Sequence, residues 1–113
     1  MASLYRSAIT VYDKTTRDVF LAFIRVHLLH HAAEGRIFGL EMMEELRHHG
    51  YEISPGTLYP LLHGLRNAGY LRVSQEVAGG KLRKYYSATA KGKKALVQMR
   101  LKIQELVREV LRA

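Results

Sequence analysis

The stretch Ser54-Pro-Gly-Thr-Leu-Tyr-Pro-Leu-Leu-His-Gly-Leu-Arg-Asn-Ala-Gly-Tyr70 decides the fold, because it carries helix signals at both ends. Ser54 can cap the first turn, Pro55 suits the first helical position, and Gly69 predicts the end of the helix. Between them an apolar stripe recurs at i, i+3, i+4 and i+7 and is formed by Leu58, Leu61, Leu62 and Leu65. The other face has small or hydrogen-bonding residues in place of long charged ones, so we expect this helix to approach a partner closely.

A proline interrupts the hydrogen bonding of this predicted helix. Pro60 stands in its second turn, where it lacks the N–H that would bond to the carbonyl four residues earlier. We therefore expect a 3₁₀ or kinked start to the helix, and not a broken helix.

A second helix precedes this one at a short distance. Gly50 predicts its end, and only residues 51–53 separate that end from Ser54. Two helices joined by so short a turn form a helix-turn-helix. One face of the earlier helix is predicted from Leu40, Met43 and Leu46, and the opposite face from Glu41, Glu44 and Glu45. The segment 36–38 before it is predicted as a short strand.

The first long helix is apolar on nearly every side. Thr15 and Asp18 form a helix-start signal, which predicts a helix from about Thr16 to Gly35. Its apolar residues are Val19, Phe20, Leu21, Phe23, Ile24, Val26, Leu28 and Leu29. A helix of this kind needs cover from its own domain and from a further surface, for which a second subunit is the candidate. Residues 1–14 show no clear period and are left unassigned.

Two extended runs around Gly79-Gly80 predict a β-hairpin. Alternation places Leu71 with Val73 on one face of the first strand, and Tyr86 with Ala88 on one face of the second. The tip is basic and carries Lys81, Arg83 and Lys84. A basic hairpin directly after a helix-turn-helix is a wing, which can lie along a phosphate backbone while the preceding helix enters the groove. The alternative is a hairpin tip that is charged only because it faces solvent.

The last helix is capped by Thr89 and runs towards Arg112, a length of roughly 35 Å. Apolar residues repeat along it with 3-4 spacing: Leu96, Met99, Ile103, Leu106 and Val110. This stripe predicts self-association, with packing inside one chain as the alternative. We thus expect a mainly α fold with a small β-hairpin. Residues 1–88 hold the N-terminal arm and the winged helix-turn-helix, and residues 89–113 hold a dimerisation helix, in one compact unit.

Charge and composition narrow the functions. The chain of 113 residues has a net charge of +8 and a pI near 10.0, which favours a polyanionic partner over simple solubility. From Arg66 to Lys102 the only acid is Glu76, whereas residues 34–52 are mainly acidic. Cysteine is absent, which excludes disulfides and thiolate metal sites. Because no apolar run is long enough to span a bilayer and no signal peptide is evident, we expect a cytoplasmic protein without a membrane partner.

The sequence contains no recognisable catalytic motif. Ser, His and Asp are present without a nucleophile elbow, and no glycine-rich phosphate loop precedes a helix. We therefore predict that the protein is not an enzyme and needs no cofactor.

Histidines on the first helix raise a separate hypothesis. His27 and His31 are spaced i, i+4, which can place two imidazoles on one metal ion, and His30 lies on the same side. The favoured interpretation is structural, because they stand amid Phe20 and Phe23 near a helix C-terminus that stabilises protonated histidine. No third ligand is evident from the sequence. No metal site is therefore predicted, with His27 and His31 as the alternative.

These motifs together resemble the PadR family of transcriptional regulators, in its short form with one C-terminal helix. The resemblance covers nearly the whole chain from about Phe20. It rests on Phe38-Gly-Leu-Glu, the segment from Leu46 to Gly50-Tyr51, the run Ser54-Pro-Gly-Thr-Leu-Tyr-Pro-Leu-Leu-His-Gly-Leu, and Gly80-Lys-Leu-Arg-Lys-Tyr-Tyr with Thr89-Ala-Lys-Gly.

The resemblance implies a homodimeric winged helix-turn-helix protein that binds operator DNA, usually as a repressor released by a small-molecule or metal effector. Its DNA-facing residues would be Ser54, Gly56, Thr57, Tyr59, Pro60 and His63 on the helix and Lys81, Arg83 and Lys84 on the wing. Its dimer contacts would be Phe20, Phe23, Leu96, Met99, Ile103, Leu106 and Val110. The alternatives are a metal-responsive regulator that uses the first-helix histidines and a winged helix that binds another protein.

Overall fold

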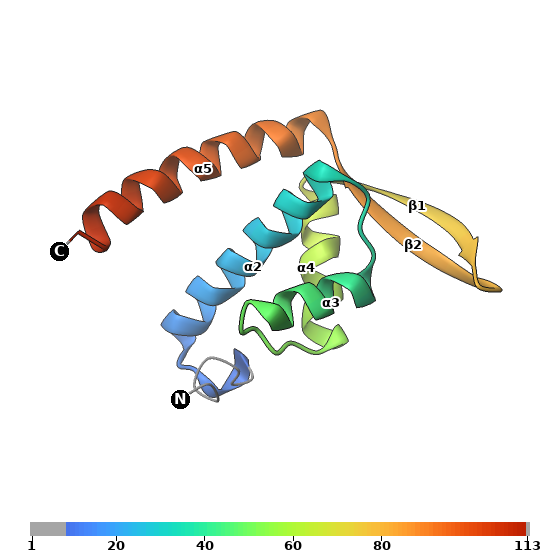
Figure 1. The fold of residues 1–113 in the computed structure, drawn as a ribbon, viewed down its shortest axis with the longest axis horizontal. Coiled ribbons are helices and arrows are strands. Elements are labelled where there is room, and N and C mark those ends of the chain that lie inside the picture. The colour runs from blue at the N-terminus through green and yellow to red at the C-terminus, as the bar shows by residue number, and fades with distance from the viewer. Residues whose placement is uncertain (1–8, 113) are drawn as a thin grey trace.

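The computed structural model describes residues 9–112, the side chain of Thr10 excepted. These residues form a 3₁₀ turn, four α-helices and one hairpin: η1 (Ile9–Val11), α2 (Lys14–Glu34), α3 (Gly39–His48), α4 (Pro55–Asn67), β1 (Leu71–Ala78), β2 (Lys81–Ala88) and α5 (Ala90–Val110) (Figure 1). The mainly helical fold with a small hairpin is therefore confirmed. Of the unassigned N-terminal arm, residues 1–8 lie outside the described part, and Ile9 packs into the core.

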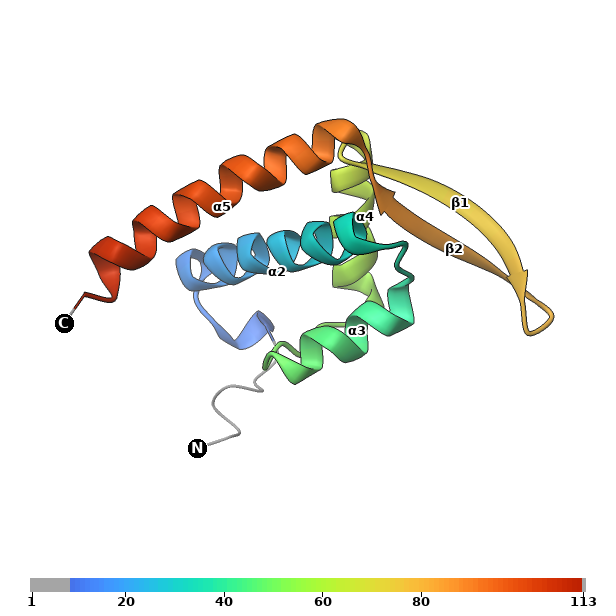
Figure 2. The ribbon, with the colours of Figure 1, turned by 45° about the horizontal axis from the view of Figure 1, so that its top comes forward.

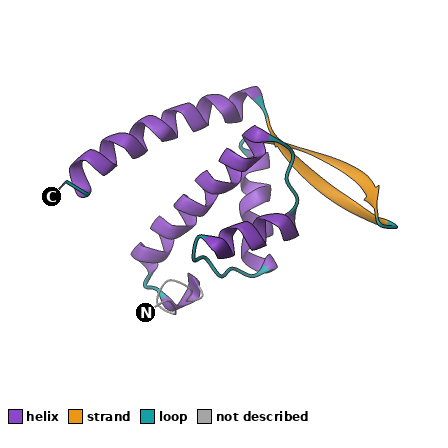
Figure 3. Cartoon of the chain, in the orientation of Figure 1, coloured by secondary structure: helices purple, strands orange, loops and turns teal. Residues whose placement is uncertain are grey.

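Helices α2, α3 and α4 pack around one hydrophobic core, which the base of the hairpin closes (Figure 2). The largest fully buried side chains are Tyr86, Ile24, Leu28, Leu29, Met42, Leu46, Leu58, Leu62 and Leu96. The strands project from one side of this helical core, and α5 leaves on the other side (Figure 3). The molecule is consequently elongated, with extents of 50 × 32 × 21 Å.

Helix α2 begins earlier than predicted and uses a different cap. Asp13, and not a signal from Thr15, caps the helix, because its carboxylate accepts a hydrogen bond of 2.8 Å from the Thr16 backbone N–H. Asp18 instead pairs with Lys14 at 2.7 Å. The helix ends at Glu34 before Gly35, as predicted. Its core side is buried, while Val19 and Phe23 on another side stay about two-fifths exposed, at 43% and 40%.

The predicted faces of α3 were right in part. Leu46 is buried, Met43 is half-buried against the core, and Glu41 and Glu44 are exposed, as predicted. Leu40, however, is 68% exposed, and the core uses Met42 together with Leu46, an i, i+4 pair. The predicted strand at residues 36–38 is also shorter than expected: Ile37 makes a single bridge to Tyr86 on β2.

Helix α4 has the predicted limits and the predicted leucine stripe. Leu58, Leu61, Leu62 and Leu65 are all buried. The Ser54 side chain makes no cap hydrogen bond within the described residues, so that prediction was wrong. The helix is unbroken around Pro60, as expected, but it is α-helical from its first residue and not 3₁₀. One hydrogen bond of the 3₁₀ type is present at the start, from the Thr57 N–H to the Ser54 carbonyl at 3.0 Å. The same carbonyl also accepts the regular α-helical bond from the Leu58 N–H.

The hairpin turns at Gly79 and Gly80, whose φ angles of 58° and 78° lie in the left-handed region that glycine adopts without strain. Leu71 pairs with Ala88 and Val73 with Tyr86, and these four residues share the face that packs on the core, as predicted. The opposite face carries the pairs Ser74 with Tyr85 and Glu76 with Arg83.

A compact joint connects the end of α4 to the start of α5. Thr89 caps α5 by accepting a hydrogen bond from the Gly92 N–H at 3.0 Å, as predicted, and its hydroxyl donates to the Gly69 carbonyl at 2.6 Å. Lys91 donates to the Ala68 carbonyl at 2.8 Å. A side chain at Gly92 would overlap the backbone carbonyl of Tyr70. The two helices are therefore fixed to each other at this end.

Candidate nucleic-acid interface

One face of α4 is free of both bulk and charge. Gly56, Pro60, His63 and Asn67 are exposed, and their 4-3-4 spacing puts them in one line opposite the buried leucines. Ser54, also exposed, stands just before the helix. A helix with so shallow a face can enter a groove deeply, and its amide and imidazole groups can bond to base edges or phosphates.

Two predicted contact residues lie at the border of this face. Thr57 is half-buried and stands beside Gly56. Tyr59 is also half-buried, and its ring packs on α3 so closely that a Cβ at Gly39 would overlap it. Tyr59 therefore joins the two helices of the helix-turn-helix, and the sequence pattern alone did not indicate this role.

The wing is anchored to the connection between α2 and α3. Arg36 pairs with Glu76 of β1 at 2.7 Å, and its guanidinium lies 4.0 Å from the centroid of the Tyr85 ring. This pairing lowers the pKa of the Glu76 carboxyl and raises that of the Arg36 guanidinium. Arg83 in turn lies 4.1 Å above the Phe38 ring. Stacking holds the Arg83 side chain in place, half-buried, while its charged group remains available to an anion.

The three predicted wing cations do not share one face. The register places Arg83 and Lys81 on the face towards Phe38, and Lys84 opposite Gln75 on the other face. Lys81 and Lys84 are exposed. A backbone that passes the tip of the hairpin therefore meets positive charge on both sides.

Two further residues border this surface and were not among the predicted DNA contacts. Asn67, which the sequence already places on the small, hydrogen-bonding side of the helix, continues the line of Gly56, Pro60 and His63, and Arg66 is exposed beside it. The spacing of four residues from His63 to Asn67 is visible in the sequence and could have added Asn67 to the predicted contacts. Arg36 and Phe38, which anchor the wing, could not be found in this way because their contacts are tertiary.

The residues predicted for dimerisation gather around an apolar groove between α2 and α5. Leu96 is buried and Met99 is half-buried, whereas Ile103, Leu106 and Val110 become progressively more exposed, at 38%, 48% and 63%. Phe23 lines the same groove, which has a volume of about 550 Å³. Phe20 lies deeper, with its ring 4.8 Å from Tyr12 and 6.2 Å from Tyr51, so it serves the core of its own chain.

The histidines of α2 lie near a third histidine, His49, which was not predicted from the sequence. His27 and His31 face the end of α3, where the His49 ring lies 4.5 Å from the ring of His27. His30 faces α5 instead, because its Nδ1 accepts from Arg100 at 3.1 Å.

A helix-turn-helix followed directly by a two-stranded hairpin defines the class of the protein: it is a winged helix-turn-helix protein, the fold of many DNA-binding regulators. The order α3, turn, α4, β1, β2 and the exposed face of α4 together meet this definition.

Comparison with known proteins places the chain within this class. The model of the transcriptional regulator PadR-like family matches residues 28–98, and the chain belongs to that family. A transcriptional regulator of Mycobacterium tuberculosis, Rv3488, is 46% identical over 95 residues, which is 84% of this chain and 89% of that protein. The crystal structure of a PadR family regulator from Eggerthella lenta is 27% identical with a TM-score of 0.69 and covers 92% of this chain and 98% of its own.

A further structure, smu.1704 from Streptococcus mutans, is 27% identical with a TM-score of 0.74 and covers 80% of this chain and 84% of its own. The protein is thus a transcriptional regulator with a winged-helix DNA-binding fold, and not an enzyme. Among residues 9–112, no helix is long and apolar enough to cross a membrane.

Proposed function

We propose that the protein is a homodimeric repressor that binds a specific operator with α4 in the major groove and the hairpin along the phosphate backbone. The observation that carries this proposal is the shallow face of α4 together with the cations of the adjoining wing. Because Gly56, Pro60 and His63 are not bulky, α4 can enter the DNA groove closely, and Arg83 on the wing is stacked in a fixed position. Operator DNA as the ligand also places the protein in the cytoplasm.

The second copy supplies the cover that α5 lacks. Beyond Leu96 the apolar side chains of α5 find little of their own chain to pack on, and the groove they line has an apolar floor from α2. The occupant we propose is α5 of a second copy, since the same stripe is then buried from both sides. In this arrangement residues 1–88 bind DNA and residues 89–113 form the dimer.

A dimer also supplies specificity that one α4 helix cannot. The line of Gly56, Pro60, His63 and Asn67 on α4 holds no long arginine or glutamine that could make two hydrogen bonds to one base. Two helices held about one helical turn of DNA apart, roughly 34 Å, add the spacing and shape of the operator to the readout. An effector that changes this separation would release the repressor.

The wing is tested by removing its charge. The double variant Lys81→Ala/Arg83→Ala should lose most DNA affinity in a mobility-shift assay while its dimer persists. A matched variant, Lys14→Ala/Arg25→Ala, loses the same charge from exposed positions on α2 and should bind nearly as the wild type does. Equal losses in both variants would favour the alternative in which the basic surface serves solubility and the winged helix binds a protein.

Salt dependence tests the same contacts without a mutation. If the dimer neutralises about six phosphates, log K should fall against log salt with a slope of about −5. Affinity that is the same at low and high salt would contradict phosphate contact.

The dimer is tested at the exposed end of the stripe. Leu106→Glu places a charge in the groove and should yield monomers in sedimentation equilibrium. Leu40→Glu alters a leucine of greater exposure on α3, outside the groove, and should remain dimeric. A Leu106→Glu protein that dimerises as the wild type does would overturn the assignment of this groove.

A further inference from the structure

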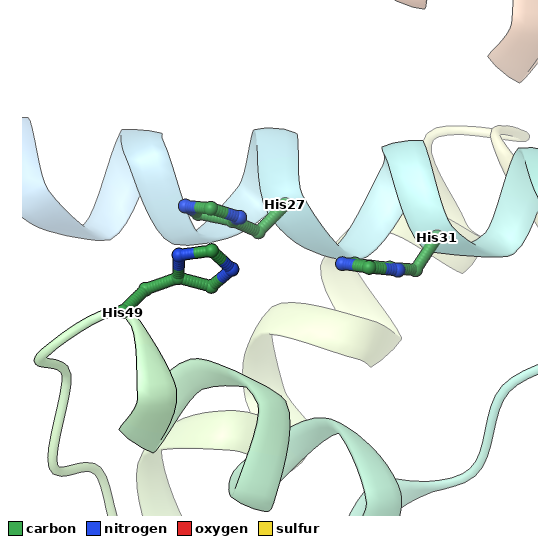
Figure 4. A group of neighbouring side chains, drawn as sticks. All are labelled: His27, His31 and His49. Atoms are coloured by element: carbon green, nitrogen blue, oxygen red, sulfur yellow. The ribbon is translucent and has the colours of Figure 1, made fainter.

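Three imidazoles from two helices converge beside the dimer groove. His27 and His31 extend from adjacent turns of α2, and His49, directly after the end of α3, lies beside them (Figure 4). One ligand nitrogen from each lies within 4.8 Å of the others. Bound to one tetrahedral ion at about 2.1 Å, such nitrogens would be roughly 3.4 Å apart, a contraction that side-chain rotation can supply.

A carboxylate completes the cluster. Glu45 Oε1 lies 3.4 Å from His31 Nε2 and 3.2 Å from His49 Nε2, so one acid contacts two of the three rings. Histidines that bind metals usually have such a carboxylate partner, which orients the ring and increases its basicity as a ligand. The negative charge of Glu45 also favours a cation at this place.

The surroundings of His27 favour its neutral form. Burial, followed by the nearby His49, His31 and His30, lowers the pKa of His27 and so favours the neutral imidazole. Neutral imidazole is the species that coordinates a metal ion. Several histidines that face one another repel each other when protonated and destabilise the fold. When they are neutral and bind one cation together, they stabilise it.

A second histidine group on α2 lacks these properties. His30, His31 and Glu34 are also close together, but both ring nitrogens of His30 are already engaged. Its Nδ1 accepts from Arg100, and its Nε2 lies 3.5 Å from Glu34. The positive guanidinium of Arg100 would repel a metal ion there, which leaves the group with His49 as the better site.

We propose that His27, His31 and His49 form a binding site for a divalent ion of the zinc type, with Glu45 as their carboxylate partner. Imidazole and carboxylate ligands suit Zn²⁺, Co²⁺, Ni²⁺ and Cu²⁺, whereas the thiolates that soft ions prefer are absent from the chain. The site joins α2 to α3 and adjoins the groove through His27.

The position of the site gives it a regulatory consequence, which rests on the proposed function. The ion would tie the end of the first helix of the helix-turn-helix to α2, which also forms the floor of the groove. Occupation therefore alters how α3 and α4 sit relative to the dimer. By linkage, the factor by which Zn²⁺ changes DNA affinity must equal the factor by which DNA changes Zn²⁺ affinity.

Metal binding is tested first, without DNA, on full-length protein that carries no polyhistidine tag. Calorimetry with Zn²⁺ should give one ion per chain, and Co²⁺ should develop the visible absorption of a four-coordinate site. His49→Ala should weaken Zn²⁺ binding at least tenfold, and His27→Ala should do the same. His48→Ala is the matched control, since His48 adjoins His49 in sequence but pairs with Glu44, and it should bind as the wild type does.

Two outcomes of this experiment would overturn the site. The first is wild-type protein that takes up no Zn²⁺. The second is a His30→Ala protein that loses as much affinity as His49→Ala, which would assign the ion to the other group on α2. Circular dichroism of each variant verifies that the fold is retained.

The regulatory step has its own readout. Zn²⁺ should change the DNA affinity of the wild type at least threefold and leave that of His49→Ala unchanged. If Zn²⁺ binds as described and DNA affinity stays constant, the regulatory role is wrong and the metal site stands. If the metal-free protein binds no DNA at any salt concentration, it is the proposed function that fails, and calorimetry still decides the site.

Discussion

Helices α2 and α5 have the same length, 21 residues, but differ in how much of each is buried by its own chain. Helix α2 buries five residues between Leu21 and Ala32, and Ile24, Leu28 and Leu29 are fully covered. Helix α5 buries only Gly92 and Leu96, both near its start, although its stripe continues to Val110. Helix α2 therefore belongs mainly to the core of its own chain, whereas α5 carries an apolar stripe that its own chain leaves largely uncovered and for which we propose a second copy.

The largest effect is expected on the α2 side of this comparison. Leu28→Ala leaves a cavity in a closed core and should lower the free energy of unfolding by about 3 kcal/mol. Because this core lies within one chain, the loss should be the same at every protein concentration. Urea unfolding at two concentrations checks this, and a loss that shrinks at high concentration would mean that the core is shared between chains.

The matching change in α5 should act on association. Ile103→Ala removes apolar area from the groove and should raise the dissociation constant of the dimer about tenfold. The stability of the isolated monomer should scarcely change. Sedimentation equilibrium measures the first quantity and dilute urea unfolding the second, and a loss confined to monomer stability would contradict the contrast between the helices.

The caps of the two helices differ in the number of contacts that they make. Thr89 both caps α5 and bonds to the end of α4, whereas Asp13 only caps α2. Thr89→Ala removes both the cap of α5 and the bond to Gly69, and should cost about 2 kcal/mol of unfolding free energy. Thr89→Ser retains the hydroxyl and should cost much less. Chemical unfolding compares the two, and equal losses would show that the threonine methyl, and not the hydroxyl, matters at the joint.

The smallest expected effect is on stability at low pH. Of the two caps, only that of α2 should respond to pH. The backbone hydrogen bond from Thr16 lowers the pKa of Asp13 below its ordinary value of 3.8. The unfolded chain therefore binds the proton more readily, so the contribution of this cap is present above pH 3.8 and is lost as the pH falls below it. Asp13→Asn keeps an acceptor without the titration, and thermal unfolding should show a shallower acid slope for this variant.

The local sequence pattern was enough to predict an element where the pattern is compatible with only one structure. The leucines of α4 repeat at helical spacing between Pro55 and Gly69, and the glycine pair at residues 79 and 80 permits a tight turn, so α4 and the hairpin were found. The start of α2 was missed because Thr15 with Asp18 and Asp13 alone are both acceptable start signals. The choice between them depends on which backbone N–H the side chain reaches.

The remaining features depend on contacts between distant parts of the chain. Leu40 and Met42 are both apolar, and only the packing of α3 on the core decides that Met42 is covered. His49 stands 22 positions after His27 in the sequence, with no spacing that relates it to α2. Arg83 is equally inconspicuous among the wing cations until Phe38 is seen beneath it. Such pairs are fixed by packing, which a pattern of local residues does not record.

The joint at Thr89 and Gly92 has a mechanical consequence. Because it fixes the start of α5 to the end of α4, α5 acts as a stiff lever of roughly 30 Å. A tilt of about 5° at this pivot displaces the far end by roughly 3 Å, close to the rise of one base pair along DNA. In the dimer that we propose, the tolerance for operators of different half-site spacing would therefore depend on the stiffness of a few hydrogen bonds that touch neither DNA nor the second copy.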